Sequence, residues 1–186
     1  MYGLVNRAVE ELITTRFGLD AWERVKARAG IDVDLFLSDE SYPDATTYQL
    51  IGAACEELQL DAQAVLVEFG KHWVLHTAVE SYGEMLKMGG RTLPEFLRNL
   101  PNFHARVVLI YPDLKPPRFS CTHVTAESMT LHYHSDRPGL TAFVEGVLLG
   151  LSELYETPIE IVLGPNRGTG HDHDEFQLRW QAAQAA

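Results

Sequence analysis

Apolar residues recur at helical spacing through the first half of the chain. In residues 4–17, 45–59 and 61–79 this spacing places them on one face, and it therefore predicts three amphipathic helices. A shorter helix is expected between the first two, with Asp20 as its N-cap and Gly30 just beyond its end. The first half of the chain is thus expected to be helical.

A further helix start is indicated by a capping-box pattern at Thr92 and Glu95, with a proline in the first turn. Pro101 interrupts the pattern, because proline lacks the backbone N–H that an α-helix uses. We therefore expect a break near Pro101 and a fresh helix over residues 102–110. That helix would carry His104 in its first turn.

The hydrophobic pattern changes from helical to extended in the second half. Residues 118–124, 128–136, 158–163 and 175–180 are expected to be strands, and residues 138–155 a helix. Two strands, a helix and two more strands indicate an antiparallel sheet with the helix packed on one face. A helical half followed by a sheet half makes the predicted fold class α+β.

Composition narrows the classes of protein to consider. The chain has 186 residues and is 46% hydrophobic, which suits one domain whose core can enclose a cofactor. A net charge of −11 argues against general nucleic-acid binding. The first residues do not resemble a signal peptide, and the longest apolar stretch is too short to span a membrane. The two cysteines form neither a disulfide framework nor a CxxC metal site, so a cytoplasmic protein with two thiols is expected.

One predicted strand has a polar end that could bind an anion. Tyr133, Ser135 and Arg137 alternate along it and would therefore share a face. Arginine binds a carboxylate or phosphate through two parallel hydrogen bonds, and hydroxyl groups can occupy the remaining lone pairs. A solvated strand end is the alternative interpretation.

Histidines are the candidates for metal chemistry. His104 lies among large apolar residues, where it is either a packed core histidine or a ligand of haem iron. His171 and His173 have metal-like spacing, but zinc needs three or four ligands, so a solvated acidic loop is expected there. His132 and His134 are interpreted in the same way. A metal-dependent enzyme using His171 and His173 is the alternative, but no catalytic motif is present, and we expect no enzyme.

Several short motifs occur in an order that matches a known family. They are Met1-Tyr2-Gly3-Leu4-Val5-Asn6, Phe69-Gly70-Lys71, Phe96-Leu97, Asn99-Leu100, His104, Tyr111-Pro112, Pro116-Pro117-Arg118-Phe119 and the Tyr-x-Ser-x-Arg motif of Tyr133, Ser135 and Arg137. Together, over residues 1–180, they make the chain resemble the H-NOX (haem nitric oxide/oxygen binding) family. That family includes the haem domain of the soluble guanylate cyclase beta subunit, and this chain would be of the bacterial stand-alone type.

The resemblance implies a fold and a cofactor. Residues 1–186 would form one H-NOX domain, with a helical subdomain over about residues 1–62. Residues 63–186 would hold the haem-ligand helices and a four-stranded antiparallel sheet, with haem b between the two subdomains. Some bacterial members also carry a cysteine-rich zinc site, whose cysteines this chain lacks.

The resemblance also implies roles for individual residues. His104 would bind the iron, Pro117 would press on the porphyrin and distort it, and the propionates would be held by Tyr133, Ser135 and Arg137. The apolar pocket is expected to include Leu4, Val5, Phe69, Trp73, Tyr82, Leu100, Phe103 and Phe143.

The expected gas selectivity depends on hydrogen-bond donors on the side of the haem opposite His104. Members that hold O₂ have a tyrosine on the helix after Tyr-x-Ser-x-Arg, where this chain has Ala142 or Phe143. The position of a further polar partner is occupied by Trp73, with His76 nearby. Bound O₂ needs a hydrogen-bond donor more than NO or CO does, so we expect a sensor that binds NO and CO and excludes O₂.

The resemblance further suggests how such a sensor signals. NO would weaken the bond between iron and His104, so that the helix carrying this residue relaxes and one subdomain shifts against the other. No output domain is evident in the sequence, so the partner is expected to be a separate histidine kinase or cyclic-dinucleotide enzyme. The alternative function is a haem-free interaction module of the same fold.

Overall fold

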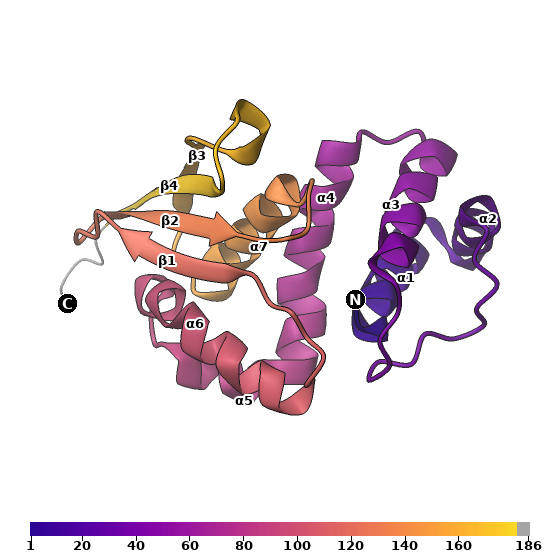
Figure 1. The fold of residues 1–186 in the computed structure, drawn as a ribbon, viewed down its shortest axis with the longest axis horizontal. Helices are drawn as coiled ribbons and strands as arrows, with labels where there is room; N and C mark the ends of the chain where they lie inside the picture. Colours follow the sequence, from indigo (N-terminus) through magenta and orange to yellow (C-terminus); the bar gives the residue numbers. More distant parts are fainter. Residues whose placement is uncertain (182–186) are drawn as a thin grey trace.

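The computed structural model describes residues 1–181, and its elements follow the predicted order of helices and strands (Figure 1). The helices are α1 (Gly3–Phe17), α2 (Leu19–Ala29), α3 (Asp44–Leu58), α4 (Ala62–His72), α5 (Val79–Gly89), α6 (Leu93–Ile110) and α7 (Thr141–Leu154). The strands are β1 (Arg118–Thr122), β2 (Ser128–His134), β3 (Ile159–Leu163) and β4 (Asp174–Trp180). The predicted α+β fold class is confirmed.

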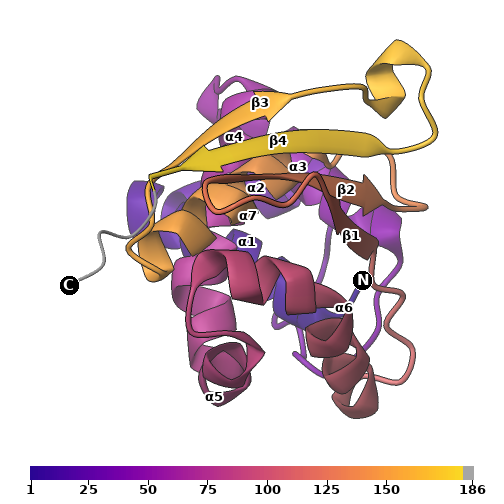
Figure 2. The same cartoon turned by 90° about the vertical axis from the view of Figure 1, so that its left-hand side faces the viewer.

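The four strands form one antiparallel sheet in the order β1-β2-β4-β3 (Figure 2). Along β2 and β4 every second side chain is buried, including Leu131, Tyr133 and Phe176. These inner residues share a core with Leu148 of α7 and Leu97 of α6. The outer face of the same two strands carries polar side chains.

A second core lies within the N-terminal helices. Residues of α1, α2 and α3, with Trp22 and Leu50 fully buried, form one cluster, which Phe69 of α4 completes. Helix α4 therefore connects this cluster to the sheet. It lies so close to α7 that a Cβ atom on Gly146 would stand 2.0 Å from the carbonyl oxygen of Val67.

The expected break at Pro101 is wrong. Helix α6 is continuous from Leu93 to Ile110 with Pro101 inside it, so His104 lies in the middle of the helix and not in a first turn. Proline removes one hydrogen bond but keeps a helical φ, and Leu97 and Val107 on either side are buried in the same core. Packing on both sides of the proline outweighs the lost bond.

Two other helix boundaries differ from expectation. Helix α2 begins at Leu19 with Gly18, at φ 86°, as its N-cap, because glycine accepts this conformation without strain. Asp20 is therefore in the first turn and is not the cap. The helix that begins at Ala62 does not stop near residue 79 but passes through a π-helical stretch, Trp73–Ala78, into α5.

Strand β2 ends at His134, two residues earlier than expected. Ser135 and Arg137 therefore lie beyond the strand, where Pro138 and Gly139 turn the chain towards α7.

The free thiols Cys55 and Cys121 are not joined to each other. Within residues 1–181, the helices are all too short or too polar to cross a membrane.

Candidate functional site

A cavity of about 260 Å³ lies between the N-terminal helices and the sheet, and its wall is overwhelmingly apolar. All thirteen residues proposed from the sequence line this one cavity: Leu4, Val5, Phe69, Trp73, Tyr82, Leu100, Phe103, His104, Pro117, Tyr133, Ser135, Arg137 and Phe143. They come from α1, α4, the π-helical stretch, α5, α6, α7, β2 and the segments beside the strands. Residues far apart in the sequence thus meet at one site.

His104 stands on α6 with its ring against Phe119, at 5.7 Å between ring centroids. Burial lowers the pKa of His104 to about 4, so its imidazole is neutral at physiological pH. Its Nδ1 atom is buried and has no hydrogen-bond partner within residues 1–181. Since buried polar atoms are nearly always satisfied, an imidazole with an unpartnered nitrogen in this cavity fits a residue that binds a ligand.

The polar end of the cavity is formed by Tyr133, Ser135 and Arg137. Burial raises the pKa of the Tyr133 hydroxyl, which therefore remains a neutral hydrogen-bond donor. The Ser135 hydroxyl accepts a bond from the backbone N–H of Arg137 at 3.1 Å, which fixes the turn after β2. A hydroxyl pair and a guanidinium at the mouth of an apolar cavity suit a ligand with an apolar body and anionic groups.

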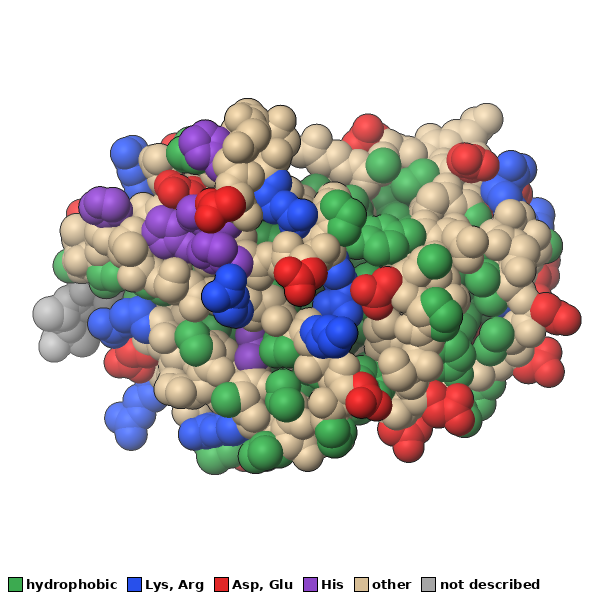
Figure 3. Space-filling view, viewed as in Figure 1, with side chains coloured by type: hydrophobic (Ala, Val, Ile, Leu, Met, Phe, Trp, Pro, Cys, Tyr) green, Lys and Arg blue, Asp and Glu red, His purple; other side chains and the backbone are tan. Residues whose placement is uncertain are grey.

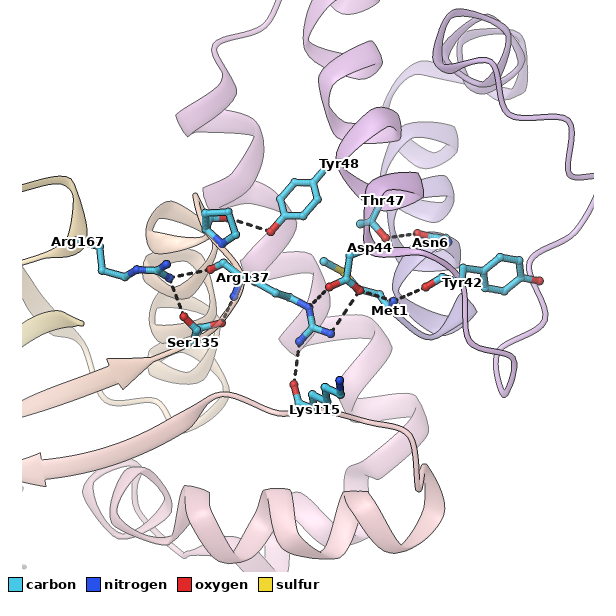
Figure 4. A network of polar contacts seen from close by, with 11 residues as sticks. Met1, Asn6, Tyr42, Asp44, Thr47, Tyr48, Lys115, Ser135, Arg137 and Arg167 are labelled. Atoms are coloured by element: carbon cyan, nitrogen blue, oxygen red, sulfur yellow. Dashed lines mark hydrogen bonds and ion pairs between the residues drawn. The ribbon is translucent and has the colours of Figure 1, made fainter. Parts of the chain in front are cut away.

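The guanidinium of Arg137 joins the half of the molecule that contains the sheet (the sheet half) to the N-terminal helices α1–α3 (Figure 4). Its Nε atom donates to Asp44 at 2.8 Å, and Nη1 donates to the carbonyl oxygen of Lys115 at 2.8 Å. The same carboxylate accepts from the N-terminal ammonium of Met1 at 2.6 Å. Burial alone would raise the pKa of Asp44, but the Met1 and Arg137 bonds together hold it below its usual value.

Sequence reasoning missed three residues that build this polar end. Arg167, between β3 and β4, donates to the carbonyl oxygens of Ser135 and Arg137 at 2.8 and 3.0 Å (Figure 4). Asp174 is 1% exposed and accepts from the backbone N–H of Arg167 at 2.8 Å. Asp44 was missed as well. No short-range pattern marks Asp44 or Arg167, because the groups that their side chains contact at this site lie 30 to 93 positions away.

Hydrogen-bond donors are scarce on the side of the cavity formed by α4 and α7. Helix α7 contributes Phe143, Val144 and Val147, and the end of α4 contributes Phe69. Trp73 lines the cavity and has an indole N–H, whereas His76 is not among the lining residues.

The fold and the cavity together define a class of cofactor-binding domain. An apolar pocket with a neutral histidine on one helix and an arginine with two hydroxyls at its rim fits haem, which needs an axial ligand and carries two propionates. Comparison with known proteins agrees with this. The Haem-NO-binding (HNOB) family model matches residues 2–163. The chain belongs to this family, the H-NOX domains, whose class is the haem-based gas sensor.

Individual relatives support the same assignment. The chain is 32% identical over 165 residues to soluble guanylate cyclase gcy-31 of Caenorhabditis elegans, covering 88% of this chain and 23% of that protein. It is 25% identical over 167 residues to gcy-32 of the same organism, covering 88% and 24%. The chain thus spans about a quarter of the length of these relatives.

Two solved structures have the same fold. An H-NOX protein from S. oneidensis in the Fe(II)NO state has a TM-score of 0.88 and 18% identity, covering 97% of this chain and 99% of that one. The Fe(II) unliganded H-NOX protein from K. algicida has a TM-score of 0.86 and 20% identity, with full coverage of both chains. At this identity the similarity establishes the fold.

Proposed function

We propose that this chain binds haem b in the cavity, senses NO, also binds CO, excludes O₂, and signals to a separate protein. One observation carries the proposal: a neutral buried histidine and a cationic arginine lie at different parts of one apolar cavity. Bound ferrous haem would supply an iron that can bind a diatomic gas. Non-covalent haem b is favoured because the sequence has no CxxCH attachment motif.

Each group of residues has a separate task in this proposal. His104 provides a neutral nitrogen to the iron, and the apolar wall excludes water from it. Tyr133, Ser135 and Arg137 bind the propionates, with Arg137 held at the rim by Asp44. Pro117 lies in the cavity wall, where it would press on the porphyrin.

Selectivity for NO and CO over O₂ rests on the apolar surface of α7. Phe143 places a ring without a hydroxyl in the cavity wall, so α7 offers no donor there. Trp73 is the donor that remains on the α4 side, and its indole N–H would have to point away from the gas. Under this proposal O₂ gains no hydrogen bond, while NO and CO do not require one.

The signal would leave the site through α6 and the polar rim. His104 is carried by α6, which is otherwise packed in the core of the sheet half, so a change in how His104 is bound would act on this helix. The contact between Arg137 and Asp44 joins that half to the N-terminal helices, so movement at either end changes the relation of the two halves. By resemblance, a histidine kinase or cyclic-dinucleotide enzyme would respond to this change.

The variant His104→Gly tests the proposal directly. We expect it to lose haem during purification and to regain haem binding when imidazole is added, because the small molecule can fill the vacated space and bind the iron. His123→Gly, at an exposed position with φ 50°, is the matched control and should keep haem without imidazole. If His104→Gly retained haem and NO-dependent signalling without imidazole, the proposed role would be wrong. If the wild-type chain took up no haem, the haem-free interaction module would remain.

A further inference from the structure

A group of histidines lies on the outer face of the sheet, on the side opposite the buried faces of β2 and β4. Figure 3 shows histidine side chains gathered on the surface of the sheet half. His132 of β2 is the direct register partner of Glu175 of β4. The ring of His134, at the end of β2, stacks on that of His173, the residue before β4, at 4.2 Å between ring centroids. The side chains of the alternate residues Tyr133 and Asp174 point inwards and are buried. This cluster is therefore separate from the cavity.

Three potential ligand atoms of this cluster converge on one point. His132 Nδ1 lies 2.9 Å from His173 Nε2, and Glu175 Oε1 lies 3.6 Å and 3.5 Å from these two nitrogens. In a tetrahedral zinc site with metal–ligand bonds of about 2.0–2.1 Å, neighbouring ligand atoms are roughly 3.3 Å apart. The observed triangle has nearly this size. The three side chains are 15, 19 and 25% exposed, so an ion could reach them from solvent.

In both imidazole rings, the nitrogen that points away from the other ligand atoms already has a hydrogen-bond partner. His132 Nε2 lies 2.7 Å from the hydroxyl oxygen of Thr122 on β1, and His173 Nδ1 lies 2.6 Å from a carboxylate oxygen of Asp172. A histidine that binds a metal usually donates its other N–H to a carboxylate, carbonyl or similar group, which fixes the tautomer and the ring orientation. If both rings donate through these nitrogens, Nδ1 of His132 and Nε2 of His173 present lone pairs to each other and to Glu175. A cation between them removes this repulsion.

We propose that His132, His173 and Glu175 bind one divalent transition-metal ion, with Zn²⁺ as the ion of best fit and water completing its coordination. Two imidazoles and one carboxylate are a donor set that Zn²⁺ accepts in tetrahedral geometry. The negative charge of Glu175 and Asp172, on a chain of net charge −11, favours a cation here. The HxH pair of His171 and His173, the alternative metal site in the sequence, is not this site, because His171 is exposed and does not belong to the cluster.

The position of the ion would give it a structural effect. It would join β2 to the start of β4 directly behind Tyr133, which belongs to the polar end of the cavity. The competing arrangement needs no ion: His132 Nδ1–H would donate to His173 Nε2, while His132 Nε2 would accept from the Thr122 hydroxyl. The two arrangements differ in whether the purified chain binds zinc at all.

The test is zinc binding by the untagged, chelator-stripped full chain, measured by titration calorimetry and by zinc content after dialysis. We expect one Zn²⁺ per chain, and we expect His132→Gln and His173→Gln each to abolish this binding. Asp172→Asn should weaken it about 10- to 100-fold, because Asp172 orients a ligand without binding the ion. His171→Gln, the matched control two residues from a proposed ligand, should bind zinc like the wild type.

Three outcomes would overturn the proposal. They are no zinc binding by a wild-type chain whose circular dichroism shows it folded, unchanged binding in His132→Gln, and equal weakening by His171→Gln. The last would indicate an exposed acidic loop that collects ions. Haem content is measured in the same samples, since the zinc proposal does not depend on the haem proposal and either can fail alone.

Discussion

His104 is held in its neutral form by the apolar residues around it, and this has a consequence for stability. In the unfolded chain its pKa returns to about 6.5, while in the folded chain it is about 4. Between these values the unfolded state binds more protons than the folded state. The free energy of unfolding must therefore fall as the pH decreases through this window.

We predict that the haem-free protein loses up to ~3 kcal/mol of stability through His104 between neutral pH and the folded pKa. His104→Leu removes this contribution, so its free energy of unfolding should depend less on pH. Urea denaturation near pH 7 and near pH 4 measures the difference, with His123→Ala as a control that keeps the wild-type dependence. Identical pH dependence in the wild type and His104→Leu would contradict the assignment of a buried neutral imidazole.

At the scale of residues, the sequence predicts the residues that line the cavity better than the residues that hydrogen-bond to its polar end. His104 and the Tyr-x-Ser-x-Arg residues line one cavity, and the family resemblance predicted that they would share a site. Asp44 and Arg167 could not be predicted, since neither lies near its partners in the sequence. Their role is visible only in the folded structure, where α3 and the loop before β4 both contact the turn after β2.

At the scale of elements, local signals are reliable where no tertiary contact competes with them. Thr92 accepts from the backbone N–H of Glu95 as the capping pattern predicts. Pro101, a strong local signal for a break, is overridden by the packing of α6 on both sides of it. The π-helical stretch before α5 was not predicted, because the apolar spacing of residues 61–79 fits an ordinary helix.

The close approach of α4 and α7 is an element-scale feature that can be tested. Gly146→Ala would place a methyl group 2.0 Å from the carbonyl oxygen of Val67, so the two helices must separate. We expect the free energy of unfolding to fall by about 1–3 kcal/mol. Urea denaturation of the haem-free protein is the measurement.

The matched control for this test is Gly52→Ala on the exposed side of α3, where an added Cβ atom meets nothing within 4 Å. It should raise the free energy of unfolding by up to about 1 kcal/mol, because alanine favours the helix over glycine. A Gly146→Ala protein as stable as the wild type would show that α4 and α7 are not in tight contact.

At the scale of the whole molecule, the change from helical to extended periodicity predicts the α+β class, whereas the strand order β1-β2-β4-β3 is known only from the structure. The cavity could not be deduced from periodicity, because it forms where two cores meet and belongs to neither alone. Only the resemblance pointed to it. Arg137 and Asp44 join the two halves at its rim, which places the proposed haem where movement between the halves can be transmitted.

The central claim is that this cavity holds a haem that senses NO and excludes O₂. The most direct measurement is the absorption spectrum of the haem-loaded, reduced protein, recorded before and after addition of NO and then for a separate sample in air. We predict a single Soret band that shifts with NO, and no stable O₂-bound spectrum in air. Absence of a Soret band after incubation with haem would contradict haem binding. A stable O₂-bound spectrum would contradict the apolar interpretation of the α7 side of the cavity.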